Sequence, residues 1–156
     1  MPTVKELAAH LTRRATAELL RFVDATPADR ITWKPAETGR PILEIVVECA
    51  GANYFHAKIL ATQAVPVRDQ QEFAKFREEN NTLEKAIASL KASTDAVVAQ
   101  IDAFPEDRLD ATIVMPFGPG VTRTFAEIML NVFYHETYHT GQIAYIQTLY
   151  GDKKMP

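Results

Sequence analysis

The fold class that the sequence predicts is all-α, a four-helix bundle with long crossover connections. Apolar residues recur with the helical period of 3.6 in four long segments. Four amphipathic helices separated by long connections are typical of bundles with crossovers. The length of 156 residues fits one domain of ordinary size, so we expect residues 1–156 to form a single domain.

The first helix is expected at residues 3–24. Thr3 and Glu6 have the spacing of a capping box at its start. Trp33, in the connection at residues 25–40, is expected to cover one end of the core. The apolar stripe of the helix consists of Val4, Leu7, Leu11, Ala15, Leu19 and Phe22.

The second helix is expected at residues 41–63, with Pro41 in the first turn, where its missing N–H is not needed. A charged crossover follows at residues 64–80, and we expect a short helix near residues 70–77. One face of the second helix combines apolar residues with a single carboxylate: Ile45, Ala52, Phe55, Ile59 and Glu48.

The third helix is expected at residues 81–104, where apolar residues follow the helical period until Pro105 stops it. Residues 111–115 are expected to pair briefly as a strand. The Pro- and Gly-rich stretch at residues 116–120 predicts a turn.

The fourth helix is expected at residues 124–150. Thr124 and Glu127 have the spacing of a second capping box, and Gly151 is a suitable residue to follow the end of the helix. Its inner face consists of Ile128, Val132, His135, His139, Ile143 and Ile146.

The composition excludes several classes of partner. The net charge is −3 and the basic residues are scattered, so no positive stripe follows a phosphate backbone and nucleic acid is not expected. No apolar stretch is long enough to span a membrane.

The single cysteine, Cys49, precludes an internal disulfide and fits a reducing compartment, and residues 1–20 do not resemble a signal peptide. We therefore expect a cytoplasmic protein.

His135 and His139 are the strongest candidates for a functional site. They are four residues apart, so they project from one helical face roughly 6 Å apart along the axis. A single histidine on an apolar face is usually a core residue with satisfied nitrogens. Two on the inner stripe must both find partners, because unpaired buried polar groups are costly, and one shared metal ion meets that need. His10, on the polar side of the first helix, is expected to be solvated.

A third ligand is expected from the second helix, and Glu48 is the first candidate. A buried carboxylate without a positive partner is expensive, and a divalent cation would supply that partner. The alternative is that Glu48 lies at the edge of the stripe and reaches water. His56 is the competitor, but it lies about 12 Å further along the helix, so Glu48 and His56 are not expected to share one ion.

The same segment matches the H-E-x-x-H pattern of zinc peptidases. That class needs a further ligand, usually downstream, and no His or Glu follows His139, so we do not predict a peptidase. Glu136 is expected to be a surface residue, although a carboxylate there is also able to orient a ligand or move a proton. Tyr138 and Gln142 flank the histidines and are candidates for hydrogen bonds to a bound water or substrate.

The sequence resembles the DinB-like superfamily of damage-inducible and thiol-transferase proteins over nearly its whole length. The likeness is carried by ITWKPAE at residues 31–37, by PILEIVVECAGANYF at residues 41–55, and by the C-terminal stretch at residues 115–151. The HxxxHxGQ pattern, which begins at His135, is its most specific part.

The resemblance implies an up-down-down-up bundle, commonly a homodimer, with a metal held by three side chains. The usual ligands in the family are three histidines, of which the last two match His135 and His139, while the first falls at Glu48. This departure implies two histidines and one carboxylate, a set that suits zinc with an open position and also nickel, iron or manganese. In characterised relatives the metal activates a low-molecular-weight thiol for transfer or isomerisation.

The sequence therefore predicts a metal-dependent enzyme, either a thiol-dependent S-transferase or a hydrolase. In this prediction a metal-activated thiol or water attacks a small electrophilic substrate. One alternative is a non-catalytic metal-binding or stress-response bundle, which a closed four-ligand site would favour. Another is a partner-binding helical module, which a large exposed apolar face would favour.

Overall fold

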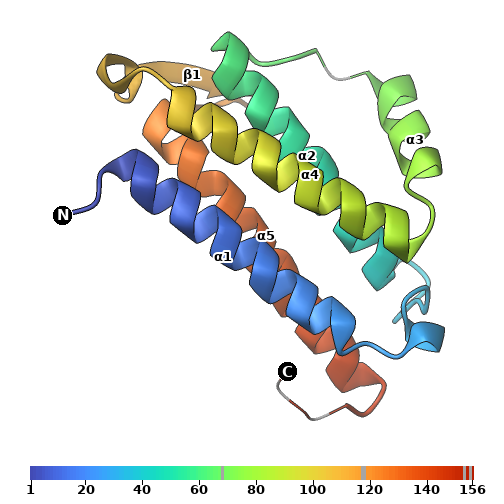
Figure 1. Ribbon diagram of the computed structural model, residues 1–156. Helices are drawn as coiled ribbons and strands as arrows, with labels where there is room; N and C mark the ends of the chain where they lie inside the picture. The colour runs from blue at the N-terminus through green and yellow to red at the C-terminus, as the bar shows by residue number, and fades with distance from the viewer. Residues whose placement is uncertain (68, 117–118, 153, 155) are drawn as a thin grey trace.

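The structure is a computed structural model that describes residues 1–67, 69–116, 119–152, 154 and 156. It is an all-α four-helix bundle (Figure 1). The helices of the bundle are α1 (Val4–Asp24), α2 (Ile42–Thr62), α4 (Leu83–Ala103) and α5 (Phe125–Leu149). Figure 1 shows α1 and α5 running in one direction and α2 and α4 in the other, which is the up-down-down-up order. The principal packing partners are α2 with α4 and α1 with α5.

The connections explain how parallel helices become neighbours. Because α2 and α4 point the same way, the chain must return along the bundle between them, and α3 (Gln70–Glu79) lies on that return path (Figure 1). Between α4 and α5 the chain forms a hairpin of β1 (Thr112–Met115) and β2 (Val121–Thr124). Single turns of 3-10 helix follow α1 and α4, at Ala28–Arg30 and Glu106–Arg108.

Most element boundaries agree with the sequence prediction. The predicted strand is present, although its partner β2 was not foreseen. Of the predicted turn at 116–120, residues 117 and 118 lie outside the described residues. Pro41 is the N-cap of α2 rather than a first-turn residue. Trp33 packs against the core and meets the Tyr150 ring edge-on at 6.0 Å, as expected for a residue covering one end.

Both predicted capping boxes are present. Thr3 Oγ1 accepts a hydrogen bond from the Glu6 backbone N–H, and the Glu6 carboxylate accepts one from the Thr3 backbone N–H. Thr124 and Glu127 form the same pair at the start of α5. Each box satisfies two N–H groups that the first helical turn leaves without a partner. The start of α5 is therefore determined locally.

The core consists of two apolar clusters with a polar layer between them. One cluster includes Phe125, Met129 and Val132 of α5, and the other includes Ile143 and Ile146 further along the same helix. The polar layer is buried and drawn from all four helices of the bundle: Thr12, Thr16, Asn53, Thr94 and Glu136.

This polar layer corrects the predicted inner face of α1. Val4 and Leu7 were expected on the apolar stripe, but each is 43% exposed. Thr12 and Thr16 are buried instead, and Thr16 Oγ1 donates to Glu136 Oε2 at 2.7 Å. Thr16 thus supplies a donor to the buried carboxylate, whereas Thr12 Oγ1 is buried without a hydrogen-bond partner among the described residues.

Within the described residues, none of the helices combines the length and the apolar character that crossing a membrane requires.

Candidate metal centre

His135 and His139 lie one turn apart on α5, and their side chains meet. Their Nε2 atoms are 3.1 Å apart, and the two rings are nearly perpendicular. The side chain of His139 is 2% exposed, while His135 is half-buried. The predicted convergence of two inward-facing imidazoles is therefore present.

The distance between the two Nε2 atoms fits joint coordination. Two nitrogens bound to one tetrahedral zinc ion at about 2.05 Å each lie about 3.3 Å apart. The observed 3.1 Å is close to that value, so an ion requires little movement of either ring. The other ring nitrogen of His135, Nδ1, is buried without a hydrogen-bond partner in the described part of the chain, and an ion bound at Nε2 would leave it so.

His139 is held in the orientation that a metal ligand requires. Its Nδ1 donates to Gln142 Oε1 at 2.7 Å, and Gln142 Nε2 donates to the Tyr138 hydroxyl at 3.0 Å. With its proton on Nδ1, His139 keeps the lone pair of Nε2 directed at the site. Ligating histidines commonly have such a second partner. Gln142 and Tyr138 were expected to contact a water or substrate, and the structure shows them orienting His139.

Two neighbouring residues of α2 provide further donors. Among the described residues, the group whose donor atoms all lie within 4.8 Å of one another is Cys49, His135 and His139. Glu48 is outside that group, although its Oε1 lies 3.7 Å from His139 Nε2. Glu48 therefore approaches one histidine, whereas Cys49 approaches both.

The surroundings of Glu48 differ from the expectation that led to its choice. We expected a buried carboxylate without a positive partner, but its side chain is 34% exposed and forms an ion pair with Arg40. Arg40 directly precedes the N-cap of α2, so the end of the connection brings its guanidinium beside the site. The charge of Glu48 is already compensated, and the need for a cation is weaker than the sequence suggested.

Burial sets the protonation of the site. Desolvation, followed by the charges of His139, His56 and Arg40, lowers the pKa of His135 to about 4. Desolvation also lowers the pKa of His139. Both imidazoles are therefore neutral at pH 7, with lone pairs available to a cation. Desolvation and the Glu136 carboxylate raise the pKa of the Cys49 thiol, so without a cation it stays protonated.

Glu136 is a correction to the sequence prediction. It was expected at the surface, but its side chain is fully buried. Its Oε1 accepts from Asn53 Nδ2 and its Oε2 from the Thr16 hydroxyl, each at 2.7 Å. Burial raises the pKa of Glu136 to about 7. The Glu of the H-E-x-x-H string therefore belongs to the polar layer and does not point to the same side as the histidines.

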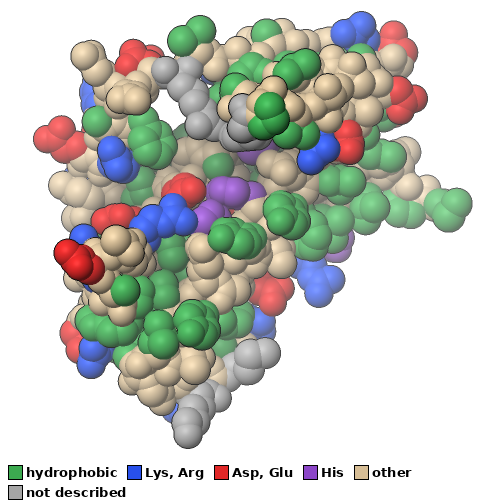
Figure 2. All heavy atoms as spheres, turned by 180° about the vertical axis from the view of Figure 1, so that it is seen from behind, with side chains coloured by type: hydrophobic (Ala, Val, Ile, Leu, Met, Phe, Trp, Pro, Cys, Tyr) green, Lys and Arg blue, Asp and Glu red, His purple; other side chains and the backbone are tan. Residues whose placement is uncertain are grey.

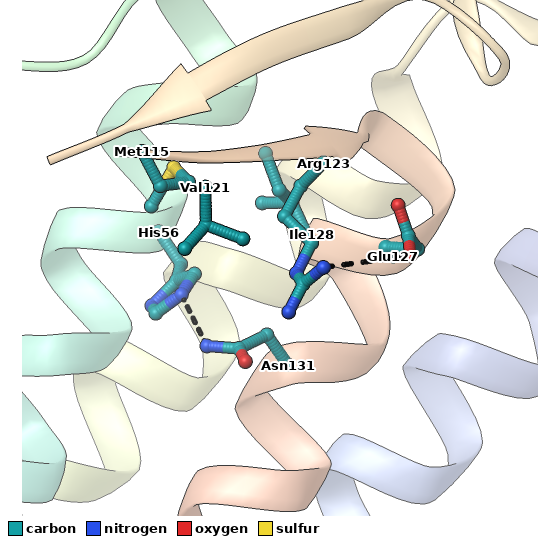
Figure 3. A pocket seen from close by; sticks show the side chains of 7 residues that line it. All are labelled: His56, Met115, Val121, Arg123, Glu127, Ile128 and Asn131. Carbon is teal, nitrogen blue, oxygen red and sulfur yellow. Dashed lines mark hydrogen bonds and ion pairs between the residues drawn. The ribbon is translucent and has the colours of Figure 1, made fainter. Parts of the chain in front are cut away.

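His56 occupies a different place from the two histidines of α5. Its Nδ1 donates to the Ala52 carbonyl at 2.7 Å, and its Nε2 accepts from Asn131 Nδ2 at 2.9 Å. Both ring nitrogens are thus engaged within the protein. Figure 3 shows His56 and Asn131 at one side of a cavity of about 200 Å³, with Arg123 reaching in from β2. Asn131 is one turn before His135 on α5, so this cavity adjoins the candidate metal centre.

The candidate centre reaches the surface at His135, which is partly exposed. Figure 2 shows histidine side chains at the bottom of a hollow, with Lys or Arg and Asp or Glu side chains along its edge. Because His135 is partly exposed, a small molecule is able to reach the candidate centre at this residue.

Cys49 is the functional candidate that the sequence analysis missed. The residue was used only to exclude a disulfide. A signal was present, because Cys49, Asn53 and His56 recur at helical spacing on a stripe that is otherwise apolar: Ile42, Ile45, Val46 and Leu60. All of these residues are buried. Groups with ligating or hydrogen-bonding capacity on a buried stripe are the ones that need a partner.

The comparisons with solved structures support the fold. The probable metal-dependent hydrolase YfiT from Bacillus subtilis, described as having an unusual four-helix bundle topology, is 14% identical with a TM-score of 0.74; the match covers 94% of this chain and 87% of that chain. A DinB-like protein from Bacillus subtilis is 19% identical with a TM-score of 0.71, and 96% of each chain is covered.

A third structure has a described thiol dependence. The mycothiol-dependent maleylpyruvate isomerase is 14% identical with a TM-score of 0.66, and the match covers 92% of this chain but 63% of that chain. At these identities the structures establish a shared fold. A search of curated proteins found no match to the sequence. The family model of the DinB superfamily matches residues 4–143, nearly the whole chain, and the protein therefore belongs to the DinB superfamily.

Proposed function

We propose that this protein is a metal-dependent enzyme, a thiol-dependent S-transferase or a hydrolase, that acts on a small electrophilic substrate. The observation that carries the proposal is the pair of neutral imidazoles, His135 and His139, whose Nε2 atoms lie 3.1 Å apart. The descriptions of YfiT as a probable metal-dependent hydrolase and of the isomerase as mycothiol-dependent are consistent with it.

The residues of the site have distinct roles in this proposal. His135 and His139 hold the ion, and Gln142 fixes the ring of His139. A third donor comes from α2, where the predicted ligand Glu48 and the neighbouring Cys49 both lie close. Zinc suits this donor set, as do nickel, iron and manganese in the version with Glu48. When bound, a divalent ion lowers the pKa of a thiol or water that reaches it and so supplies a nucleophile near neutral pH.

The space around the site suits a small substrate. The partial exposure of His135 admits a thiol or water to the site, and the adjoining cavity of about 200 Å³ accepts part of a substrate. Arg40 lies at the site, where its guanidinium forms an ion pair with Glu48 and is a candidate donor to an anionic group of a substrate. In a transfer step the thiol sulfur bonds to the electrophilic carbon, the leaving group departs with the electron pair, and the thiol proton passes to solvent.

Metal binding is the first test. We expect purified protein to contain close to one equivalent of a divalent transition metal by elemental analysis. His135→Ala and His139→Ala should each lose most of it. His10→Ala is the matched control, because His10 is exposed on α1, and it should retain the metal. Equal metal content in all three variants would remove the basis of the proposal.

Catalysis is the second test. Metal-loaded protein, glutathione or N-acetylcysteine, and monochlorobimane should form the fluorescent thioether, with release of chloride, faster than the same mixture without protein. For the hydrolase version, p-nitrophenyl acetate replaces the thiol and the bimane. His139→Ala should reduce either rate to that of the mixture without protein. If the metal-loaded protein accelerates neither reaction, the enzyme proposal loses its support for these substrate classes.

A non-catalytic metal-binding bundle is the second candidate function. The observation that favours it is the presence of two donor residues, Glu48 and Cys49, beside the two histidines. If all four bind one ion, the site is closed, which is typical of structural zinc. X-ray absorption of the zinc-loaded protein separates the two cases, because an open site contains a light-atom ligand that a bound thiol replaces by sulfur.

A homodimer and a cytoplasmic location complete the proposal. Several tyrosines of α5 are exposed, among them Tyr134 and Tyr145 at 68% and 66%, and they offer apolar area for association with a second copy. Light scattering during size-exclusion chromatography should give twice the mass of 17.4 kDa.

The cytoplasmic location rests on the single cysteine, and fractionation of cells that express the protein with an epitope tag checks it.

A further inference from the structure

We propose that Cys49 is the third protein ligand of the metal, so that the ion is held by one thiolate and two imidazoles. This inference rests on the proposed metal binding and makes it more specific. It assigns Glu48 a different role, that of a carboxylate paired with Arg40 at the edge of the site.

The placement of the donor atoms carries the assignment. Cys49 Sγ and the donor nitrogens of His135 and His139 all lie within 4.8 Å of one another. On a tetrahedral zinc ion, with bonds of about 2.3 Å to sulfur and 2.05 Å to nitrogen, sulfur and nitrogen lie about 3.6 Å apart. A displacement of about 1 Å is therefore enough to bring all three atoms into coordination. The nitrogens are already in place, so this movement falls on the Cys49 side chain.

Burial distinguishes Cys49 from Glu48. The side chain of Cys49 is completely buried, on the face of α2 that packs towards the polar layer and α5. Glu48 is 34% exposed, and its carboxylate already has the Arg40 guanidinium as a partner. Glu48 Oε2 is the atom that meets Arg40, and Oε1 lies 3.7 Å from His139 Nε2, so Glu48 would still have to approach His135 to share an ion with both histidines. Cys49 is already near both histidines.

The alternative is that Cys49 only fills space in the apolar core and binds no ion, as is common for buried cysteines. The geometry argues against this alternative. Its Sγ lies within 4.8 Å of the donor nitrogens of two neutral imidazoles, a position where a purely apolar residue would offer no ligand. A cation between the three donors uses both nitrogen lone pairs and the sulfur.

A thiolate ligand narrows the metals that fit. Soft sulfur donors favour zinc over manganese or magnesium, whose preferred ligands are oxygens. With three protein ligands, the fourth position of a tetrahedral ion remains open to a water or a thiol. The proposal therefore predicts a zinc-type centre with one sulfur and two nitrogen ligands and one exchangeable position.

Cobalt substitution tests the proposal directly. Because the chain contains one cysteine, any protein thiolate bound to cobalt comes from Cys49. We expect the cobalt-loaded protein, purified without added thiol, to show a near-ultraviolet thiolate-to-cobalt charge-transfer band. Cys49→Ala and Cys49→Ser should lose this band and bind zinc at least about 100-fold more weakly. Glu48→Gln is the matched control on the next residue, and it should keep the band.

The outcomes separate this inference from the proposed function. Cobalt bound at one equivalent without the charge-transfer band overturns the thiolate ligand and leaves the metal-dependent proposal standing. Loss of cobalt from Glu48→Gln, with full retention in Cys49→Ala, also overturns it and assigns the position to Glu48. A chain that binds no ion at all overturns both. Circular dichroism checks the folding of each variant, and the band in the unaltered protein decides the question even where a variant does not fold.

Discussion

At the scale of single residues, the same physical requirement explains both His139 and Glu136. Each is a polar group on the inside of α5, with exposed fractions of 2% and 0%. Each is satisfied by partners from other positions: His139 by Gln142 and His135, and Glu136 by Thr16 and Asn53. The difference is charge. The imidazole is neutral and leaves a lone pair for a cation, whereas the carboxyl group has no basic side chain among its hydrogen-bond partners.

Glu136 leads to a prediction about pH. Burial raises its pKa from 4.5 to about 7, so the folded state favours the protonated form. A group with a raised pKa contributes stability that is fully present below pH 4.5 and is lost as the pH rises through about 7. The shift corresponds to roughly 3 kcal/mol between the two ends of that window. Glu136→Gln removes this titration, while its amide still meets the Asn53 and Thr16 partners.

Urea denaturation of the chelator-treated protein measures this effect. From pH 5 to pH 8 the free energy of unfolding of Glu136→Gln should rise relative to that of the unaltered protein, by up to about 3 kcal/mol. The difference between the two proteins is the relevant quantity, because the histidines contribute to both equally and with the opposite sign. Parallel pH profiles would show that the carboxyl group titrates normally despite its burial.

At the scale of secondary structure, α5 matters most because it carries both histidines and the polar-layer carboxylate. Its start is determined by the Thr124–Glu127 capping box, and Gly151, with φ of 93°, follows its end in the left-handed conformation. A residue with a side chain is strained at such a φ, so glycine is suited to stopping the helix there. These local signals determine where the helix begins and ends before any packing is considered.

The capping box gives a prediction at this scale. Thr124→Ala removes the side chain that accepts from the Glu127 backbone N–H, and the free energy of unfolding should fall by about 1 kcal/mol. Thr122→Ala on β2 is the control, since its side chain is exposed and caps no helix; its effect should stay within about 0.5 kcal/mol. Urea denaturation followed by circular dichroism compares the two variants. If both variants lost the same free energy of unfolding, the capping hydrogen bond of Thr124 would contribute no measurable stability.

At the scale of the whole molecule, the candidate centre joins helices that are distant in sequence. The α2 donors and the α5 histidines are more than 80 residues apart, and an ion held by both would link the two helices across the bundle. An ion that binds the folded chain and not the unfolded chain stabilises folding by mass action.

The corresponding prediction is thermal. Free zinc at 100 times its dissociation constant should stabilise the protein by about 2.7 kcal/mol and raise the melting temperature. His139→Ala should show no such rise, and His10→Ala should behave like the unaltered protein. Differential scanning calorimetry with buffered zinc provides the measurement. A similar rise in His139→Ala would indicate that zinc binds elsewhere.

The parts of the site that lie on one helix were predictable from the sequence. His135 and His139 share a face because a helix brings residues four apart together, and that relation does not depend on the rest of the chain. The same holds for the two capping boxes and for the four helices themselves. Glu48 was a reasonable candidate on spacing. Spacing along the helix does not show that Arg40, from the preceding connection, pairs with Glu48, or that the neighbouring Cys49 is more deeply buried.

The sequence by itself determined the four helices, their ends, and the facing of two histidines into the bundle, because these follow from local hydrogen bonds and from the helical period. Only the tertiary structure decided which groups meet those histidines. It brings Cys49 to both of them, pairs Glu48 with Arg40, and buries Glu136 among Thr16 and Asn53. These contacts depend on how each helix is rotated against its neighbours, and that rotation is set by packing across the whole bundle rather than by any one segment.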